Sequence, residues 1–187
     1  MPPSLDIHAA AAALKHGAVL AYATEAVFGL GCDPQDESAV LRLLDIKQRS
    51  VDKGVILVAA RVDQFETCLD WSALPPDRID AVWATWPGPH TWIVPSTPRV
   101  PRWITGTHVA VAVRVSAHPV VAALCEAFGG PLVSTSANLA GMPPARTADA
   151  LDPALLARID GIVEGRVGGL AQPTDIRDAR TGAVLRG

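Results

Sequence analysis

The sequence has few cysteines and lacks any long apolar run. Its three cysteines, Cys32, Cys68 and Cys125, form no C-x-x-C pair, which argues against a zinc ribbon or a disulfide framework. We expect three reduced, mostly buried thiols. No apolar run reaches the roughly eighteen residues that a membrane-spanning helix needs. The N-terminus, "MPPSLDIHAAAAALKHG", has no basic segment of the kind that begins a secretory signal. These absences predict a cytoplasmic protein.

The chain also lacks an excess of basic residues and the commonest catalytic motifs. It has 16 Lys and Arg against 19 Asp and Glu, a net charge of −3 at pH 7. This balance argues against a surface that binds nucleic acid or anionic lipid as a whole. Neither a Walker P-loop, a G-x-G-x-x-G turn, a G-x-S-x-G elbow nor an H-E-x-x-H helix is present. The five histidines have no metal-ligand spacing, so we expect no metal bound by protein side chains.

What is present is an alternation of apolar runs and helical patterns. Five short runs are continuously apolar, as expected for strands covered on both faces: 18–23, 54–60, 91–95, 108–115 and 131–136. Three helices are predicted between them: 4–16, capped by Ser4 and ended by Gly17, then 36–47 and 118–130. The pattern predicts a single α/β domain, residues 1–187, built on a mixed sheet with flanking helices.

A cluster of cations precedes one of the predicted strands. In "LDIKQRSVDKGVILVAA" (44–60), Lys47, Arg49 and Lys53 stand before an apolar run. An isolated K-x-R is most simply a solvated helix end, where cations offset the helix dipole. If the helix ends near Lys47 and the next residues are extended, Lys47 and Arg49 share a face. They could then bind one ligand beside the sheet edge.

Polar residues show the same two-residue spacing in "PLVSTSANLAG" (131–141). An extended chain would place Ser134, Ser136 and Asn138 on one side, with small neighbours that allow close approach. The alternative is a helix N-cap or an Asx turn, which Ser and Asn also favour. This segment alone does not specify a ligand.

A third segment, "YATEAVFGLGCDP" (22–34), places two functional side chains directly after a predicted strand. These are Thr24 and Glu25, and we expect Gly29 and Gly31 to permit a tight backbone turn behind them. Thr24 could equally be an ordinary turn residue. Glu25 could orient Lys47 or act as a base, and nothing in the pattern separates those roles from simple solubility.

These three segments together resemble the YrdC-like family, the threonylcarbamoyl-AMP synthases of the short bacterial type. "TWPGPHTWIVP" (85–95), "AVAVRVSAHP" (110–119) and the tail "GRVGGLAQPTDIRDARTG" (165–182) extend the resemblance over nearly the whole chain. It implies an open, twisted α/β sheet with a deep, positively charged cavity. The implied enzyme is a nucleotidyltransferase that forms threonylcarbamoyl-AMP and pyrophosphate from L-threonine, bicarbonate and ATP. Partner proteins would then use the product for the threonylcarbamoyladenosine modification of tRNA.

The resemblance also implies roles for particular residues. The family's K-x-R…S-x-N signature supplies the catalytic and ATP-binding residues, which here are Lys47, Arg49, Ser136 and Asn138, with Thr91 as a further candidate for ATP. Three residues are expected to bind threonine: Thr24, Arg114 and Thr135. Arg114 would form a bidentate pair with the carboxylate, which lysine could not reproduce. Mg²⁺ is expected to accompany ATP, held by phosphate oxygens and water.

The competing hypothesis is an RNA-binding module that acts in tRNA or ribosome maturation without chemistry of its own. Its support is the basic cavity and two surface arginines, Arg99 and Arg102, beside Trp103. Weak RNA binding by an enzyme is also compatible with these residues. Two positions depart from the family pattern: Ala23 replaces a common proline, and His90 replaces a usually apolar residue.

Overall fold

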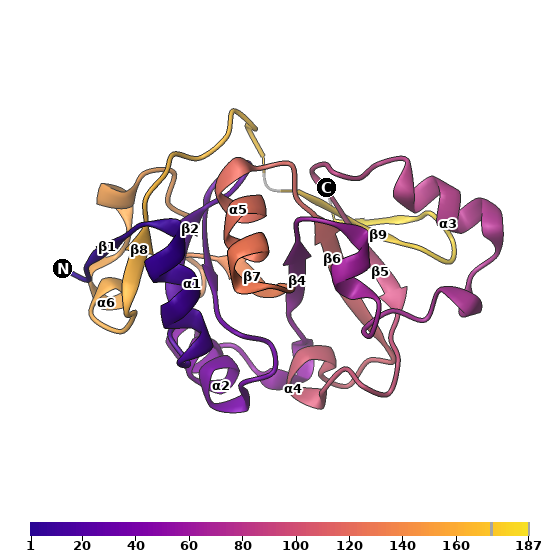
Figure 1. The fold of residues 1–187 in the computed structure, drawn as a ribbon, viewed down its shortest axis with the longest axis horizontal. Helices are drawn as coiled ribbons and strands as arrows, with labels where there is room; N and C mark the ends of the chain where they lie inside the picture. Colours follow the sequence, from indigo (N-terminus) through magenta and orange to yellow (C-terminus); the bar gives the residue numbers. More distant parts are fainter. Residues whose placement is uncertain (173, 187) are drawn as a thin grey trace.

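Ten strands form one mixed sheet flanked by helices (Figure 1) in the computed structural model, which describes residues 1–172 and 174–186. Pro173, within the tail segment that carries part of the resemblance, lies outside the described residues, as does Gly187. The strands are β1 (Ser4–Leu5), β2 (Leu20–Ala23), β3 (Phe28–Gly31), β4 (Ile56–Ala59), β5 (His90–Pro95), β6 (Ala110–Val115), β7 (Leu132–Ser136), β8 (Gly161–Val163), β9 (Asp175–Asp178) and β10 (Val184–Arg186). The α-helices are α1 (Ile7–Lys15), α2 (Glu37–Ile46), α3 (Pro76–Trp83), α4 (Arg102–Thr105), α5 (Pro119–Phe128) and α6 (Pro153–Leu156). Four 3₁₀ helices complete them: η1 (Val51–Lys53), η2 (Val62–Phe65), η3 (Trp71–Ala73) and η4 (Ala148–Ala150).

The order of the strands in the sheet differs from their order along the chain. It runs β1-β8-β2-β3-β7-β4-β6-β5-β9-β10. The β4–β6, β5–β9, β2–β8 and β1–β8 pairs are parallel, whereas β3–β7, β4–β7 and β5–β6 are antiparallel. The predicted α/β fold with a mixed sheet is confirmed. Each of the five predicted apolar runs overlaps a strand.

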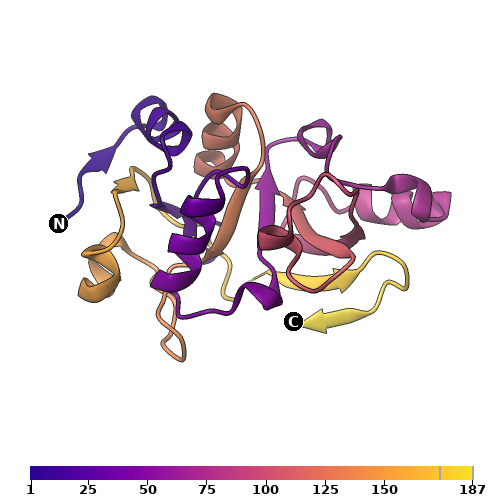
Figure 2. The same cartoon turned by 90° about the horizontal axis from the view of Figure 1, so that it is seen from below.

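The central strands are covered on both faces, as their continuous apolar runs predict. Successive side chains of a strand point to opposite faces. In β2, Leu20 and Tyr22 pack in the core cluster formed with α1 and α5, while Ala21 and Ala23 pack in the larger cluster on the other face. Figure 2 shows α1 and α5 side by side on one face, and the β9–β10 hairpin at the other end of the sheet from β1.

Two local predictions at the N-terminal end of the chain are wrong. Helix α1 begins at Ile7 with Asp6 as its cap, whose side chain accepts a hydrogen bond from the Ala9 amide at 2.8 Å. Ser4 instead belongs to β1, where it pairs with Ile162.

Gly29 and Gly31 lie in strand β3 rather than in a tight turn. The Tyr22 ring crosses this strand, and its hydroxyl donates to the Val133 carbonyl of β7 at 3.0 Å. A Cβ on Gly31 would lie 2.3 Å from that carbonyl oxygen and 2.6 Å from the ring. Position 31 therefore requires glycine, because any side chain there would collide with Tyr22 and the Val133 carbonyl.

The K-x-R segment is a turn rather than the extended chain that we predicted. Helix α2 ends at Ile46, and Gln48 has a left-handed φ of 51°. The Arg49 amide donates to the Leu44 carbonyl at 2.9 Å and the Gln48 amide to the Asp45 carbonyl at 3.0 Å. This pair of bonds is the Schellman motif that commonly ends a helix, here with Gln where Gly is usual.

The three cysteines are free and buried, as predicted. Burial raises the pKa of the Cys125 thiol to about 12, so it is uncharged near neutral pH. Across the described ranges, no helix combines the length and the apolar character that a membrane span requires.

Candidate active site

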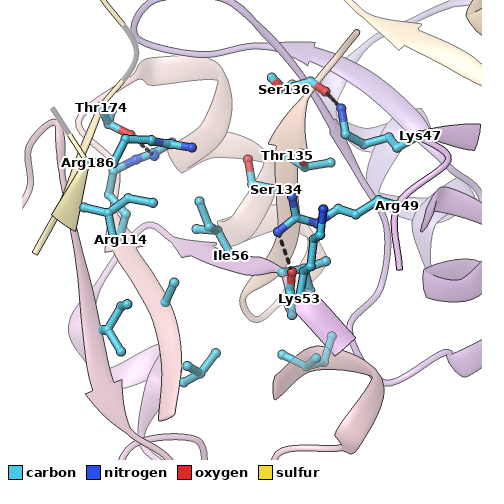
Figure 3. Close-up of a pocket in the computed structure, with 18 of the residues that line it drawn as sticks. Lys47, Arg49, Lys53, Ile56, Arg114, Ser134, Thr135, Ser136, Thr174 and Arg186 are labelled. Carbon is cyan, nitrogen blue, oxygen red and sulfur yellow. Dashed lines mark hydrogen bonds between the residues drawn. The ribbon is translucent and has the colours of Figure 1, made fainter. Parts of the chain in front are cut away.

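A cavity of about 1040 Å³ opens on the face of the sheet that α1 and α5 cover. Leu132 of β7 and Val58 of β4 pack beneath α5. Ser134 and Ile56 each lie two residues away in the same strand and therefore on the same face of the sheet. Beyond the helix these side chains form the cavity floor instead of core (Figure 3). The site is therefore a continuation of the sheet surface that the helices leave uncovered.

The cavity lining is rich in cations. Six Lys and Arg residues line it, whereas no Asp or Glu does so in the part of the chain that the structure describes: Lys47, Arg49, Lys53, Arg114, Arg180 and Arg186. Figure 3 shows Arg114 and Arg186 on one side and Lys47, Arg49 and Lys53 on the other, with β7 between them. Because clustered like charges repel, this arrangement fits a polyanionic ligand.

Lys47 sits at the end of α2 and reaches the end of β7. Its ammonium group donates to the carbonyls of Ser136 and Asn138, the second at 2.8 Å. The residue is only 7% exposed. Burial, and then the nearby Arg49, lower the pKa of Lys47 to about 8. The group is therefore charged below about pH 8 and titrates far below an ordinary lysine.

Arg49 belongs to the same turn as Lys47. One of its terminal nitrogens donates to the Gly54 carbonyl at 3.0 Å, and its Nε is buried with no hydrogen-bond partner. Burial and the charge of Arg186 lower the pKa of the Arg49 guanidinium. Both features indicate that an anion would improve its environment.

Arg114 lies on the other side of the floor, in β6. Its Nη1 donates to Thr174 Oγ1 at 3.0 Å, and its Nη2 lies 3.3 Å from Glu25 Oε2. The residue is 5% exposed, and its Nε has no hydrogen-bond partner among the described residues. A buried guanidinium with an unsatisfied N–H is suited to binding a ligand carboxylate.

Comparison with known proteins assigns the chain to a family. The Sua5/YciO/YrdC family model, described as "Telomere recombination", matches residues 12–187. The chain belongs to this family. A threonylcarbamoyl-AMP synthase of Xanthomonas campestris pv. campestris (strain B100) is 66% identical over 186 residues, covering 100% of both chains. The predicted resemblance is therefore confirmed.

Solved structures have the same fold. Sua5 of P. abyssi, in a complex with L-threonine, matches with a TM-score of 0.86 and 30% identity, over 95% of this chain and 54% of that one. E. coli YciO matches with a TM-score of 0.87 and 25% identity, over 100% of this chain and 95% of that one. The chain thus spans about half the length of the P. abyssi protein.

Seven of the eight residues that the family resemblance singled out line the cavity: Thr24, Lys47, Arg49, Arg114, Thr135, Ser136 and Asn138. The exception is Thr91, which is fully buried and outside the lining, with its hydroxyl 3.4 Å from Arg114 Nη1. Thr91 thus lies behind Arg114, and its position does not favour the predicted contact with ATP.

The other polar residues of the family signature also have local partners. The Thr24 hydroxyl donates to the Val27 carbonyl at 2.7 Å. The side-chain amide of Asn138 donates through Nδ2 to the carbonyls of Leu139 and Met142 at 3.0 and 2.7 Å, which fixes the loop after β7. Its Oδ1 lies 3.5 Å from Lys47 Nζ. The two halves of the signature therefore meet at the end of β7.

The C-terminal hairpin supplies cavity residues to which the sequence pattern assigned no role. Thr174, Arg180 and Arg186 come from the segment that forms β9 and β10. Thr174 and Ile176 both line the cavity, and their two-residue spacing is the signal that could have placed them on one face of a strand. A lone arginine near the end of a chain, such as Arg186, carries no such signal.

The described part of the chain offers no evident ligand set for a metal ion. No group of three or more His, Cys, Asp or Glu side chains comes together among the described residues. The lining groups that could contact a metal are hydroxyls, amides, carbonyls and the single imidazole of His108, alongside six cationic side chains that would repel it. A resident Mg²⁺ held by the protein does not fit this site.

Proposed function

We propose that this chain is a nucleotidyltransferase that forms threonylcarbamoyl-AMP and pyrophosphate from L-threonine, bicarbonate (or carbon dioxide) and ATP. One observation carries the proposal: a single cavity holds a cluster of cations with no carboxylate among its described lining residues and, across its floor, a buried arginine whose Nε has no partner among them. The first suits a triphosphate and the second an amino-acid carboxylate. The full-length likeness to a threonylcarbamoyl-AMP synthase supports the same activity.

The reaction requires two anions to meet. The amine of threonine adds to carbon dioxide and loses a proton, which gives a carbamate. A carbamate oxygen then attacks the α-phosphorus of ATP, and the bond to the bridging oxygen breaks to release pyrophosphate. No covalent enzyme nucleophile is needed. The protein contributes by aligning the reactants and by neutralising negative charge on the leaving group.

We assign the phosphates to the cations beside β7. Lys47 and Arg49 would bind them together with Ser136 and Asn138, while Lys53 and Arg186 add charge from either side. A hydrogen bond to a charged group contributes on the order of 1.5–3 kcal/mol, so each cation is expected to be worth about 10-fold to 100-fold in affinity or rate.

We assign the amino acid to the opposite side of the floor. Arg114 would bind the carboxylate, with Thr24, Thr135 and Thr174 around it. Thr91 supports Arg114 from behind. In this assignment the amine of threonine would face the phosphates.

Mg²⁺ would enter with ATP, bound by phosphate oxygens and water, since the described lining residues include no carboxylate. We further propose that the protein acts in the cytoplasm. Partner proteins there would transfer the threonylcarbamoyl group to an adenosine of tRNA. Weak binding of RNA by the chain itself is part of the same proposal.

The test is pyrophosphate release from ATP in the presence of Mg²⁺ and bicarbonate, with and without L-threonine, and with serine and valine as controls. Release that depends on both threonine and bicarbonate is expected. No release, combined with tight and salt-sensitive RNA binding, would favour the binding-module hypothesis instead.

A further inference from the structure

We propose that Glu25 and Ser116 are positioning residues, which hold the guanidinium of Arg114 in place for the carboxylate of the amino-acid substrate. This inference rests on the proposed function and deepens it. Neither residue lines the cavity, so both would act through Arg114 rather than on the substrate.

The three side chains form a buried chain of contacts. Glu25 Oε1 accepts a hydrogen bond from Ser116 Oγ at 2.6 Å, and Oε2 lies 3.3 Å from Arg114 Nη2. Ser116 Oγ also accepts from the His118 amide at 3.1 Å, at the start of α5. Glu25 is 7% and Ser116 1% exposed. One carboxylate oxygen of Glu25 is therefore fixed by Ser116 just before α5, and the other faces Arg114.

A second set of contacts fixes the backbone at Glu25. The segment 165–172, which we call the strap, crosses it on the way from β8 to β9. The Gly168 amide donates to the Thr24 carbonyl at 2.9 Å, and the Leu170 amide to the Glu25 carbonyl at 3.2 Å. The strap itself lies against His118, whose Nε2 is 3.0 Å from the Arg166 carbonyl oxygen. Glu25 is thus fixed through its side chain and its backbone.

The geometry indicates positioning rather than charge neutralisation alone. The 3.3 Å separation of Glu25 and Arg114 is longer than the roughly 2.7–2.9 Å of a strong charge-assisted hydrogen bond. Glu25 and Thr174 occupy the two terminal nitrogens of Arg114 and leave Nε without a partner. The guanidinium plane is therefore set by fixed oxygens, and these contacts leave part of its five-donor capacity for a ligand.

Glu25→Gln, Ser116→Ala and the control Glu164→Gln test the proposal. Glu164 accepts from Ser4 Oγ at 3.4 Å on the surface, so it offers the same pair of side-chain types away from the cavity. The measurements are the dissociation constants of L-threonine and L-threoninamide by calorimetry, the KM for ATP, and thermal unfolding. Threoninamide lacks the carboxylate charge that Arg114 would bind.

Glu25→Gln is expected to weaken L-threonine binding by about 10-fold, the value of one hydrogen bond to a charged group. Threoninamide binding and the KM for ATP should stay within about twofold, so the preference for the carboxylate shrinks. Ser116→Ala should act in the same direction with a smaller effect, and Glu164→Gln should resemble the wild type. Ser116→Ala keeps the test decisive if Glu25→Gln does not fold, because it retains both members of the ion pair.

Two results would overturn the proposal. If the variants weaken threonine and threoninamide equally, or lower only the unfolding temperature, the buried pair has a structural role alone. A wild-type protein that binds threonine and releases pyrophosphate, with variants that leave the preference unchanged, would refute this inference and retain the proposed function. A wild-type protein that does neither would refute the proposed function itself.

Discussion

Lys47 has two competing influences on its charge. Its ammonium group donates to the carbonyls of Ser136 and Asn138, which favours the protonated form. Burial and Arg49 act in the opposite direction and lower its pKa to about 8. Because the two carbonyls belong to β7 and the loop after it, the charged group also fixes the end of that strand beside the cavity. The same residue therefore combines a structural role with the phosphate-binding role that we propose.

The lowered pKa predicts a pH dependence of ATP use. Lys47 is protonated below about pH 8 and loses its charge as the pH rises through that value, so kcat/KM for ATP should fall above pH 8. The loss of one charge-assisted hydrogen bond predicts a decrease of about 10-fold once the group is neutral. Lys47→Arg is the control, because arginine stays charged throughout and titration of the threonine amine affects both proteins alike.

The measurement is kcat/KM for ATP from pH 7 to 10 in both proteins, compared as a ratio. Wild-type activity that declines relative to Lys47→Arg above about pH 8 would agree with the role in phosphate binding. Parallel profiles would show that the charge of Lys47 does not matter to ATP.

The sequence pointed to Lys47 and Arg49 as ligand-binding candidates, but on the basis of a backbone conformation that the structure does not have. We expected extended chain, in which residues two apart share a face. The Schellman motif with a left-handed Gln48 brings both side chains to the cavity instead. The sequence singled out Glu25 but could not assign its role, since its partner Arg114 lies far along the chain and only folding brings the two together.

The strap passes so close to the backbone of Glu25 that it requires a glycine at position 168. A Cβ on Gly168 would lie 2.6 Å from the Glu25 carbonyl oxygen, whereas nothing lies within 4 Å of the Cβ position of Gly169. The neighbouring glycines therefore form a matched pair. Glycine is required at position 168, because the backbone of Glu25 lies close to it, but not at position 169.

Gly168→Ala is expected to displace the strap from Glu25 and to weaken threonine binding. Overpacking of this kind typically costs about 1–3 kcal/mol, which corresponds to a fall of roughly 2–12 °C in Tm for a chain of this size. Gly169→Ala should leave both the Tm and the affinity for threonine close to wild type. Thermal unfolding and calorimetry with L-threonine check the pair, and equal behaviour of the two variants would contradict the prediction.

The predicted and the missed elements differ in their apolar content. The strands at the centre of the sheet are buried on both faces, so their runs are continuous and easy to recognise. Strand β9, in contrast, consists of Asp175, Ile176, Arg177 and Asp178, and β10 is exposed along its length. These short strands form because β5 offers a free edge for pairing, which no local pattern reports.

The whole molecule has an uneven distribution of charge. The chain carries a net charge of −3, yet six cations line one cavity with no lining carboxylate among the described residues. Acidic residues elsewhere on the surface do not cancel this local field, because charges more than about 10 Å apart are largely screened at 0.1 M salt. The cavity should therefore attract ATP selectively within a protein that is acidic overall.

This charge distribution predicts different salt dependences for the two substrates. Raising the ionic strength from about 0.05 M to 0.5 M shortens the Debye length several-fold, so the KM for ATP should rise by several-fold. Threonine is a zwitterion with no net charge, and its KM should change little. Steady-state kinetics with each substrate varied in turn test this, with sodium chloride and sodium acetate compared to exclude a specific ion effect. An equal response of both KM values would contradict it.

The strand order also affects how the protein acquires its activity during folding. The cavity combines Thr24, from the first quarter of the chain, with Thr174 and Arg186 from its last strands. Contacts between such distant segments form late, because closing long loops costs entropy before any contact compensates for it. A partly folded chain, or one still emerging from the ribosome, therefore lacks one wall of the cavity. We therefore expect ATP use to begin only once the C-terminal hairpin has paired with β5, so that folding intermediates do not waste nucleotide.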